Sequence, residues 1–169
     1  MVFSCRNGDF ILNCRVLALL TLFAFVSMQN IGLAKSADTT IRVWTDSSSG
    51  YALGGFDPLS YFVDQRPRRG KAKFEHDLNG TIWKFTNSGN REAFARHPQY
   101  YLPAFGGYDP FALARQKTTI GLPTIWSLHK GRVYLFHNAV NRKLWEEDPE
   151  AHIAEAVDYW QIALKKLTN

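Results

Sequence analysis

A five-residue segment of this chain occurs twice, and each copy opens a similar stretch of sequence. Gly54-Gly55-Phe56-Asp57-Pro58 returns 52 positions later as Gly106-Gly107-Tyr108-Asp109-Pro110. Six further residues return 51 positions later without a gap: Gly80, Phe85, Asn87, Asn90, Arg91 and Pro98 correspond to Gly131, Phe136, Asn138, Asn141, Arg142 and Pro149. A fixed period of this size marks one supersecondary unit that is used twice. We therefore expect two like units, residues 54–105 and 106–152, around one shared core.

Each repeat contains the pattern of a β-hairpin followed by a helix. Residues 74–78 and 81–86 flank Asn79-Gly80, which is a strong signal for a type I′ turn. Residues 125–129 and 132–137 flank Lys130-Gly131 in the same way. Helices are expected next, over about 88–96 in the first repeat and about 139–147 in the second. Asn87 and Asn138 are placed to cap them.

The C-terminal stretch, residues 149–167, has the clearest helical pattern of the chain. Its apolar residues recur at the helical period and form one stripe. They are Ile153, Val157, Trp160 and Leu164, widened by Ala156, Ala163 and Leu167. Together the two hairpin-plus-helix repeats and this closing helix predict an α+β domain over residues 51–169. The strand aromatics, Trp83 and Phe85 and then Tyr134 and Phe136, are expected in its core, with a ligand-binding aromatic pocket as the alternative.

The first 34 residues have the composition of a secretory signal peptide. Arg6 and Arg15 supply positive charge, residues 16–28 are a short apolar run, and Gly32-Leu33-Ala34 supplies small residues before a cleavage site. We expect Sec-type export, cleavage after Ala34 and a periplasmic or secreted protein. The alternative is an uncleaved segment, which would then be the chain's contact with the membrane. Residues 35–50 are expected to form a flexible lead-in.

Composition excludes several classes of site from the rest of the chain. Both cysteines, Cys5 and Cys14, lie in the predicted signal peptide, so no thiolate metal site, disulfide or cysteine nucleophile is expected after cleavage. The formal net charge of +5 is modest, and its densest part, residues 66–73, contains proline and glycine. We expect a solvated loop there, with contact to anionic lipid head groups or other polyanions as the alternative. No nucleic-acid partner is expected.

A set of aromatic, glycine and proline positions resembles a known family. The set comprises residues 52–58 with Tyr61-Phe62, then Asn79-Gly80, Trp83, Phe85, Asn90-Arg91, Phe94, Pro98, Tyr101, Pro103 and residues 105–108. In this pattern the chain resembles the YHS domain family in its exported bacterial form, over about residues 51–115. YHS domains are small metal-binding modules found beside heavy-metal pumps and in monooxygenases. The resemblance therefore implies a small binding module.

The chain departs from this family at the cysteine positions. Metal-type YHS domains have cysteines where this chain has Ser60, Thr86 and Asn90, and exported members often have one where it has Asp109. None of these four residues is a soft metal ligand. The resemblance thus implies the fold, but a metal site here would need nitrogen and oxygen donors.

Histidine and aspartate are the donors that the sequence offers for such a site. We expect Asp57, Asp109, His76 and His137 as candidate ligands of copper or zinc, both of which accept imidazole and carboxylate. No short metal motif joins them, so the site would be assembled by the fold. The alternatives are solvated or core histidines, and helix capping by the two Asp-Pro pairs. Gly54-Gly55 and its copy are expected in tight turns rather than in an anion site.

The favoured interpretation is a periplasmic binding module that holds a metal ion or a small ligand between its two repeats. The alternative is a structural or protein-interaction domain that has lost the family's metal site and contacts another envelope protein. An enzyme that uses Asp57 or Asp109 with a histidine has the least support, because no nucleophile motif is present.

Overall fold

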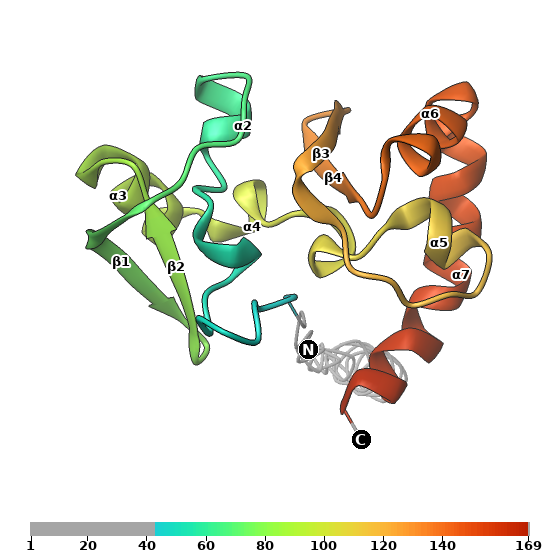
Figure 1. Cartoon of the computed structure of the whole chain (residues 1–169), viewed down its shortest axis with the longest axis horizontal. Helices are drawn as coiled ribbons and strands as arrows, with labels where there is room; N and C mark the ends of the chain where they lie inside the picture. The colour runs from blue at the N-terminus through green and yellow to red at the C-terminus, as the bar shows by residue number, and fades with distance from the viewer. Residues whose placement is uncertain (1–42, 169) are drawn as a thin grey trace, which may run out of the picture. The chain divides into compact units, whose positions relative to one another are not determined.

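A computed structural model of the chain describes residues 43–168. The predicted signal peptide and residues 35–42 of the predicted lead-in lie outside the described residues. Within residues 43–168 no helix is both long and apolar enough to cross a membrane. The α+β fold with a closing C-terminal helix is confirmed (Figure 1).

The first repeat contains a short 3-10 helix, a hairpin and three short helices. They are η1 (Leu53–Gly55), α2 (Ser60–Val63), β1 (Lys71–Leu78), β2 (Thr81–Phe85), α3 (Ser88–Arg96) and α4 (Pro98–Tyr101). The two strands form an antiparallel two-stranded sheet. The hairpin and α3 lie where the sequence places them, whereas α4 was not expected.

The second repeat follows the same order and ends in a long helix. Its elements are η2 (Ala104–Gly107), α5 (Pro110–Ala114), β3 (Leu122–His129), β4 (Arg132–Phe136), α6 (Ala139–Glu147) and α7 (Pro149–Thr168). The strands again form a two-stranded antiparallel sheet of their own. Where the first repeat has the four-residue α4, the second has the 20-residue α7.

The hairpin turns have the backbone that the sequence predicts. Asn79 and Gly80 have φ of 54° and 78°, and Lys130 and Gly131 have φ of 47° and 72°. Positive φ at both central residues is what a type I′ turn requires. Both hairpins also share a register shift four residues into the first strand, between Lys71 and Glu75 and between Leu122 and Trp126. The repeat therefore extends to the irregular parts of the backbone.

A glycine holds the start of each hairpin against the paired strand. Gly70 N–H donates to Gly55 O at 2.9 Å, and Gly121 N–H donates to Gly107 O at 2.9 Å. A Cβ at Gly70 would lie 2.4 Å from the backbone carbon of Lys84, and one at Gly121 would lie 2.5 Å from Leu135 Cβ. Contacts this short leave no room for a side chain, so both sites require glycine.

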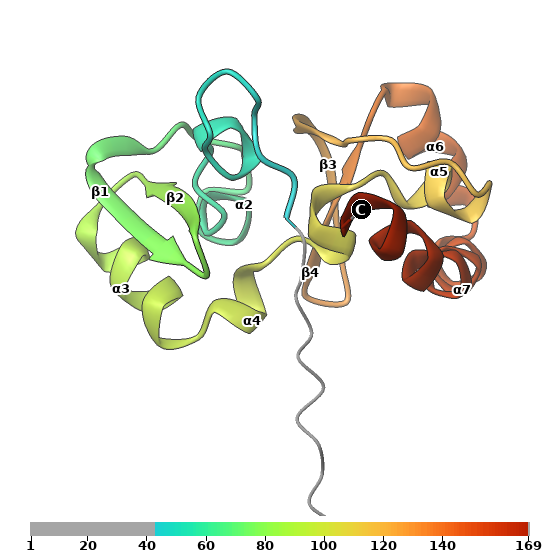
Figure 2. The ribbon, with the colours of Figure 1, turned by 90° about the horizontal axis from the view of Figure 1, so that it is seen from below.

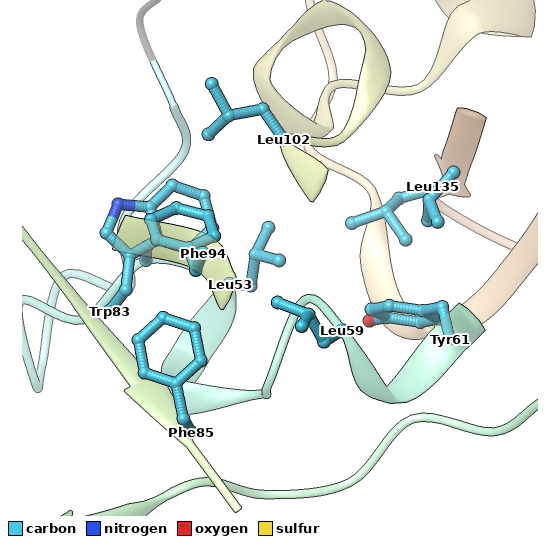
Figure 3. Close-up of a cluster of buried hydrophobic side chains, with 10 residues drawn as sticks. Leu53, Leu59, Tyr61, Trp83, Phe85, Phe94, Leu102 and Leu135 are labelled. Atoms are coloured by element: carbon cyan, nitrogen blue, oxygen red, sulfur yellow. The ribbon is translucent and has the colours of Figure 1, made fainter. Parts of the chain in front are cut away.

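One hydrophobic cluster joins the two repeats. Trp83, Phe85 and Phe94 pack with Leu53, Leu59, Tyr61 and Leu102 of the first repeat and with Val133 and Leu135 of β4 (Figure 3). All are buried. The aromatic ring of Phe94 lies 4.9 Å from that of Trp83 and 5.1 Å from that of Phe85, measured between centroids. The expected shared core is therefore present, and Trp83 and Phe85 are part of it.

The second repeat has its own buried residues, and α7 closes them. Tyr134, Phe136 and Trp145 form one cluster, and Ala156, Tyr159 and Ala163 of α7 pack with Leu113 of α5 in another. Helices α5 and α7 lie side by side in both ribbon views (Figures 1 and 2).

The buried face of α7 differs from the expected stripe. Ala156 and Ala163 are fully buried and Tyr159 nearly so, whereas Val157 is 54% exposed. Of the expected stripe only Val157 is therefore wrong, since Ile153, Trp160 and Leu164 are half-buried and Ala156 and Ala163 are buried. Small residues at 156 and 163 let α7 approach α5 closely, and the tyrosine ring fills the space between them. Hydrophobicity alone had favoured the valine.

Residues just before η1 connect the two repeats. Trp44 N–H donates to Gly106 O at 2.8 Å, and Thr45 pairs with Ala52 as an isolated bridge. Val43 and Trp44 pack on the shared cluster. This part of the predicted lead-in is therefore tied to the fold.

Candidate functional site

Asp57 is fully buried and holds the parts of the first repeat together. Its Oδ1 accepts from the backbone N–H of Leu59 at 2.9 Å, which caps the turn before α2. Its Oδ2 accepts from Thr86 N at 2.8 Å, Thr86 Oγ1 at 2.8 Å and Asn90 Nδ2 at 2.7 Å. One carboxylate thus joins the start of α2 to the end of β2 and the start of α3.

Asp109 does the same in the second repeat and is also fully buried. Its Oδ1 accepts from the N–H groups of Phe111 and Ala112 at 2.9 and 3.1 Å. Its Oδ2 accepts from His137 N at 2.8 Å and Asn141 Nδ2 at 2.7 Å. The capping alternative is therefore confirmed for Asp109, which is the N-cap of α5, whereas Asp57 caps only the turn that precedes α2.

The two aspartate networks are copies of each other. Thr86 and Asn90 of the first network correspond to His137 and Asn141 of the second, 51 positions later. Each carboxylate accepts four hydrogen bonds within its own repeat, which is the arrangement that a buried charged group needs. Asn90 and Asn141 serve these networks. Asn87 and Asn138 cap α3 and α6 as expected.

The four predicted metal ligands are divided between the repeats. Asp57 and His76 belong to the first and Asp109 and His137 to the second. The ring of His76 packs edge-on against Phe94 at 6.0 Å, and the exposed ring of His137 has Nδ1 3.3 Å from Ile120 O. Within residues 43–168, no group of three or more His, Cys, Asp or Glu side chains is placed to hold a metal ion. The copper or zinc site stays a prediction.

Two other histidines pair with glutamates at the surface. His129 Nε2 lies 2.7 Å and Lys130 Nζ 2.5 Å from Glu150 Oε1. Hydrogen bonds from Lys130, and then from His129, lower the pKa of Glu150. His152 packs on Phe111 at 5.2 Å and lies 3.5 Å from Glu155. These contacts tie α7 to its surroundings and require no ligand.

The Gly-Gly segments form tight turns, as the sequence predicts. Gly54 and Gly55 have φ of 58° and 80°, and Gly106 and Gly107 have φ of 61° and 86°. Glycine adopts this left-handed region at no steric cost. The surroundings of Gly55 and Gly107, however, differ between the two repeats, and the candidate site lies beside Gly55.

A hollow of about 490 Å³ lies beside Gly55 in the first repeat. We call it the aromatic hollow, and its lining includes Trp44, Asp46, Tyr51, Phe56, Arg69 and Lys84. Lys84 Nζ lies 3.5 Å from the centroid of the Tyr51 ring, and Arg69 Cζ lies 4.6 Å from that of Phe56. The volume is within the range of small-molecule sites. Two cations and three aromatic rings thus border one hollow.

The charges around the aromatic hollow are partly compensated. Lys84 Nζ lies 3.6 Å from Glu75 Oε1, and Arg69 Nη1 donates to Gly54 O at 3.1 Å. Hydrogen bonds from the Ser48 and Ser49 hydroxyls lower the pKa of Asp46 to about 2, so its carboxylate stays charged at neutral pH. Within the described residues, Arg69 has no carboxylate at ion-pair distance.

The same place in the second repeat is apolar and filled. Residues equivalent to Tyr51, Arg69 and Lys84 are Pro103, Ile120 and Leu135. A Cβ at Gly107 would lie 3.5 Å from Leu135 and 3.7 Å from Pro103, and also 3.2 Å from Leu53 of the first repeat. The counterpart of Leu53 is Phe105, which packs on Tyr134 and Trp160 instead. Phe105 therefore does not lie beside Gly55 in the way that Leu53 lies beside Gly107.

Sequence reasoning missed the aromatic hollow, although a signal was present. Among the positions that line this hollow, two have a cation where the second repeat has an apolar residue, Arg69 with Ile120 and Lys84 with Leu135. The sequence-based prediction used only the residues that the two repeats share. Residues that differ between the repeats are not required by the common fold and can therefore have a separate function.

In comparisons with known proteins, no family model, no curated protein and no solved structure matches this chain. The resemblance to the YHS domain stays a prediction, as do export and the periplasmic address.

Proposed function

We propose that this chain is a small-ligand-binding module and that the aromatic hollow is its ligand site. The observation that carries the proposal is the replacement of Ile120 and Leu135 by Arg69 and Lys84 at equivalent places of one fold. The second repeat shows that the backbone forms with apolar residues there. The fold therefore does not require the two cations of the first repeat, which leaves binding as their proposed role.

The lining indicates the chemical class of the ligand. Trp44, Tyr51 and Phe56 line the aromatic hollow, and aromatic side chains of this kind pack against a flat apolar group. Arg69 offers its guanidinium, which binds carboxylates with two parallel hydrogen bonds. A planar molecule with one carboxylate fits this combination, and the charged Asp46 disfavours ligands of higher negative charge.

The proposal assigns no catalytic step. Asp57 and Asp109, the residues weighed for acid chemistry, each accept four hydrogen bonds from their own repeat. Their role in the fold accounts for their recurrence. The proposed ligand site is the aromatic hollow, whose lining contains no residue of either network.

The test uses matched ligand pairs on protein produced from the full-length sequence. Benzoate is compared with benzamide, and indole-3-acetate with its amide, by following backbone amide shifts in NMR titrations. We expect the acids to shift Gly54, Gly55 and Gly70 at millimolar concentration or below, and the amides to bind at least fivefold more weakly. Benzoate and indole-3-acetate serve as probes of the class.

Lys84→Leu supplies the matched variant, since leucine is the residue of the second repeat at that place. Lys84→Leu should lower the affinity for the acids at least threefold, whereas Lys143→Leu, on the exposed side of α6, should leave this affinity unchanged. No shift at the three glycines with any probe, or equal losses in both variants, would reject the proposal. A structural or protein-interaction domain would then be the better interpretation.

A further inference from the structure

A second hollow, of about 440 Å³, lies where the segment before β1 passes the end of β2. We call it the basic hollow, and it is lined by Asp64, Arg68, Arg69, Lys71, Thr86 and Asn87. Two of its three cations, Arg68 and Arg69, come from the segment that links α2 to β1 (Figure 2), and the third, Lys71, is the first residue of β1. The sequence predicts only a solvated loop for residues 66–73, or contact with a polyanion.

Two of the three cations at the basic hollow have no ion-pair partner among the described residues. Arg68 Nε lies 3.7 Å from Asp64 Oδ2. Within residues 43–168, neither Arg69 nor Lys71 has a carboxylate at ion-pair distance. Like charges held in one short segment repel one another, and this repulsion is relieved when an anion binds among them.

The second repeat shows that the fold does not require these cations. Residues equivalent to Arg68, Arg69 and Lys71 are Thr119, Ile120 and Leu122. Their backbone makes the same contacts. Asp57 N–H donates to Arg68 O at 2.8 Å and Asp109 N–H to Thr119 O at 2.9 Å, and Arg69 and Ile120 form the same isolated bridge with Phe56 and Tyr108.

Polar groups beside the cations can orient an anion. Asn87 Nδ2 donates to Thr86 Oγ1 at 3.2 Å and carries a second hydrogen, which makes no hydrogen bond to the described residues. Arginine guanidinium groups present parallel N–H donors that match the oxygens of a phosphate, and lysine adds a compact charge. Two arginines, one lysine and an amide therefore suit a group with three terminal oxygens and two charges.

We infer that the basic hollow binds a phosphate monoester or a terminal phosphate of a polyphosphate. Such a group could come from a free phosphorylated molecule or from a phosphate-bearing lipid head group. The inference goes beyond the proposed ligand of the aromatic hollow and does not depend on it. Arg69 borders both hollows, so Arg68 and Lys71 are the residues that test this site alone.

The test variant carries the residues of the second repeat, Arg68→Thr with Lys71→Leu. Its control, Lys117→Thr with Lys143→Leu, removes the same charge from exposed places outside the hollow. Both are made in protein produced from the full-length sequence, and thermal unfolding verifies that each is folded. A third protein, Lys84→Leu, lacks a cation of the aromatic hollow only.

Binding of inorganic tripolyphosphate is measured by calorimetry at two salt concentrations. We expect the hollow variant to bind at least tenfold more weakly than the unmodified protein. The control and Lys84→Leu should stay within twofold of it. Equal losses in the hollow variant and the control would show diffuse charge attraction and overturn the inference, as would the absence of binding by the unmodified protein.

The source of the phosphate is separated by a vesicle assay. Phosphatidylcholine vesicles with and without phosphatidic acid are compared with soluble tripolyphosphate at equal phosphate concentration. Tighter binding to phosphatidic acid vesicles, lost in the hollow variant, would support the site with a lipid source. Binding of soluble tripolyphosphate alone would support it with a free source. Vesicle binding that the hollow variant retains would contradict a site at Arg68 and Lys71.

Discussion

The Tyr61 hydroxyl donates a hydrogen bond of 2.9 Å to the backbone oxygen of Pro123 and thereby connects α2 of the first repeat with β3 of the second. The ring is fully buried and packs edge-on against Trp126 at 5.3 Å. Burial, and then the negative charge of Asp57, raises the pKa of Tyr61 above its ordinary value.

This raised pKa predicts a loss of stability at alkaline pH. Above about pH 10 the tyrosine of the unfolded chain ionises while folded Tyr61 keeps its proton, so the unfolded state binds fewer protons and unfolding becomes easier as the pH rises. Tyr61→Phe should reduce this slope, which urea unfolding between pH 8 and 11 measures. Part of the slope should remain in this variant, because burial also raises the pKa of Tyr134.

At neutral pH the same variant should lose about 1 kcal/mol, because the oxygen of Pro123 loses its donor. An unchanged alkaline slope in Tyr61→Phe would mean that the folded tyrosine ionises normally. Tyr100→Phe is the control, since this side chain is 66% exposed.

The two aspartate networks predict matched losses of stability. Asp57→Asn and Asp109→Asn each replace a carboxylate oxygen, which accepts hydrogen bonds, with an NH2 group that faces the same donors and cannot accept. Each variant should lower the free energy of unfolding by about 3 kcal/mol. Chemical unfolding at pH 7 measures the loss. Asp77→Asn, at the exposed hairpin turn, should cost less than 1 kcal/mol. A loss confined to metal binding, with stability unchanged, would contradict the structural role.

Substitutions at Gly121 and Gly131 should separate the cost of a steric clash from the cost of backbone strain. Gly121→Ala should lower stability by about 3 kcal/mol, since its Cβ would lie 2.5 Å from Leu135 Cβ and 2.7 Å from backbone atoms. Gly131→Ala should cost only about 1 kcal/mol, because its φ of 72° strains an alanine but no atom lies within 4 Å. Thermal unfolding compares them, and equal losses would contradict the close approach.

The aromatic packing predicts energetic coupling between strand and helix. The first repeat pairs Trp83 with Phe94 at 4.9 Å, and the second pairs Tyr134 with Trp145 at 4.9 Å, so the larger ring changes sides. Phe94→Trp alone should overpack and cost about 2 kcal/mol. Adding Trp83→Tyr should recover at least 1 kcal/mol, as a double-mutant cycle would show. Additive losses would mean that the two rings do not share one space.

Much of the fold could be predicted because the signals are local. Asn79-Gly80 and Lys130-Gly131 fix the hairpin turns, and Asn87 and Asn138 fix the starts of α3 and α6. Each depends on backbone preferences within a few residues. The repeat then gave a second, independent signal for the hairpin and for the helix that follows it in each unit.

The parts that sequence reasoning missed depend on distant contacts. Val157 is exposed because α7 approaches α5 through Ala156 and Ala163, and nothing near Val157 in the sequence shows this. The aromatic hollow exists because Leu53 lies against Gly107 and no equivalent residue lies against Gly55. The candidate metal ligands were chosen by chemistry alone, and the structure commits the two carboxylates to capping.

The shared hydrophobic cluster has a consequence for how the chain folds during synthesis. Leu53 and Trp83 belong to one buried cluster with Val133 and Leu135, which are synthesised about 80 residues after Leu53. Until β4 emerges, the first repeat has its hairpin and caps but an open apolar side. Sequence-distant contacts of this kind slow folding, so we expect the core of the first repeat to be completed only after β4 has been synthesised.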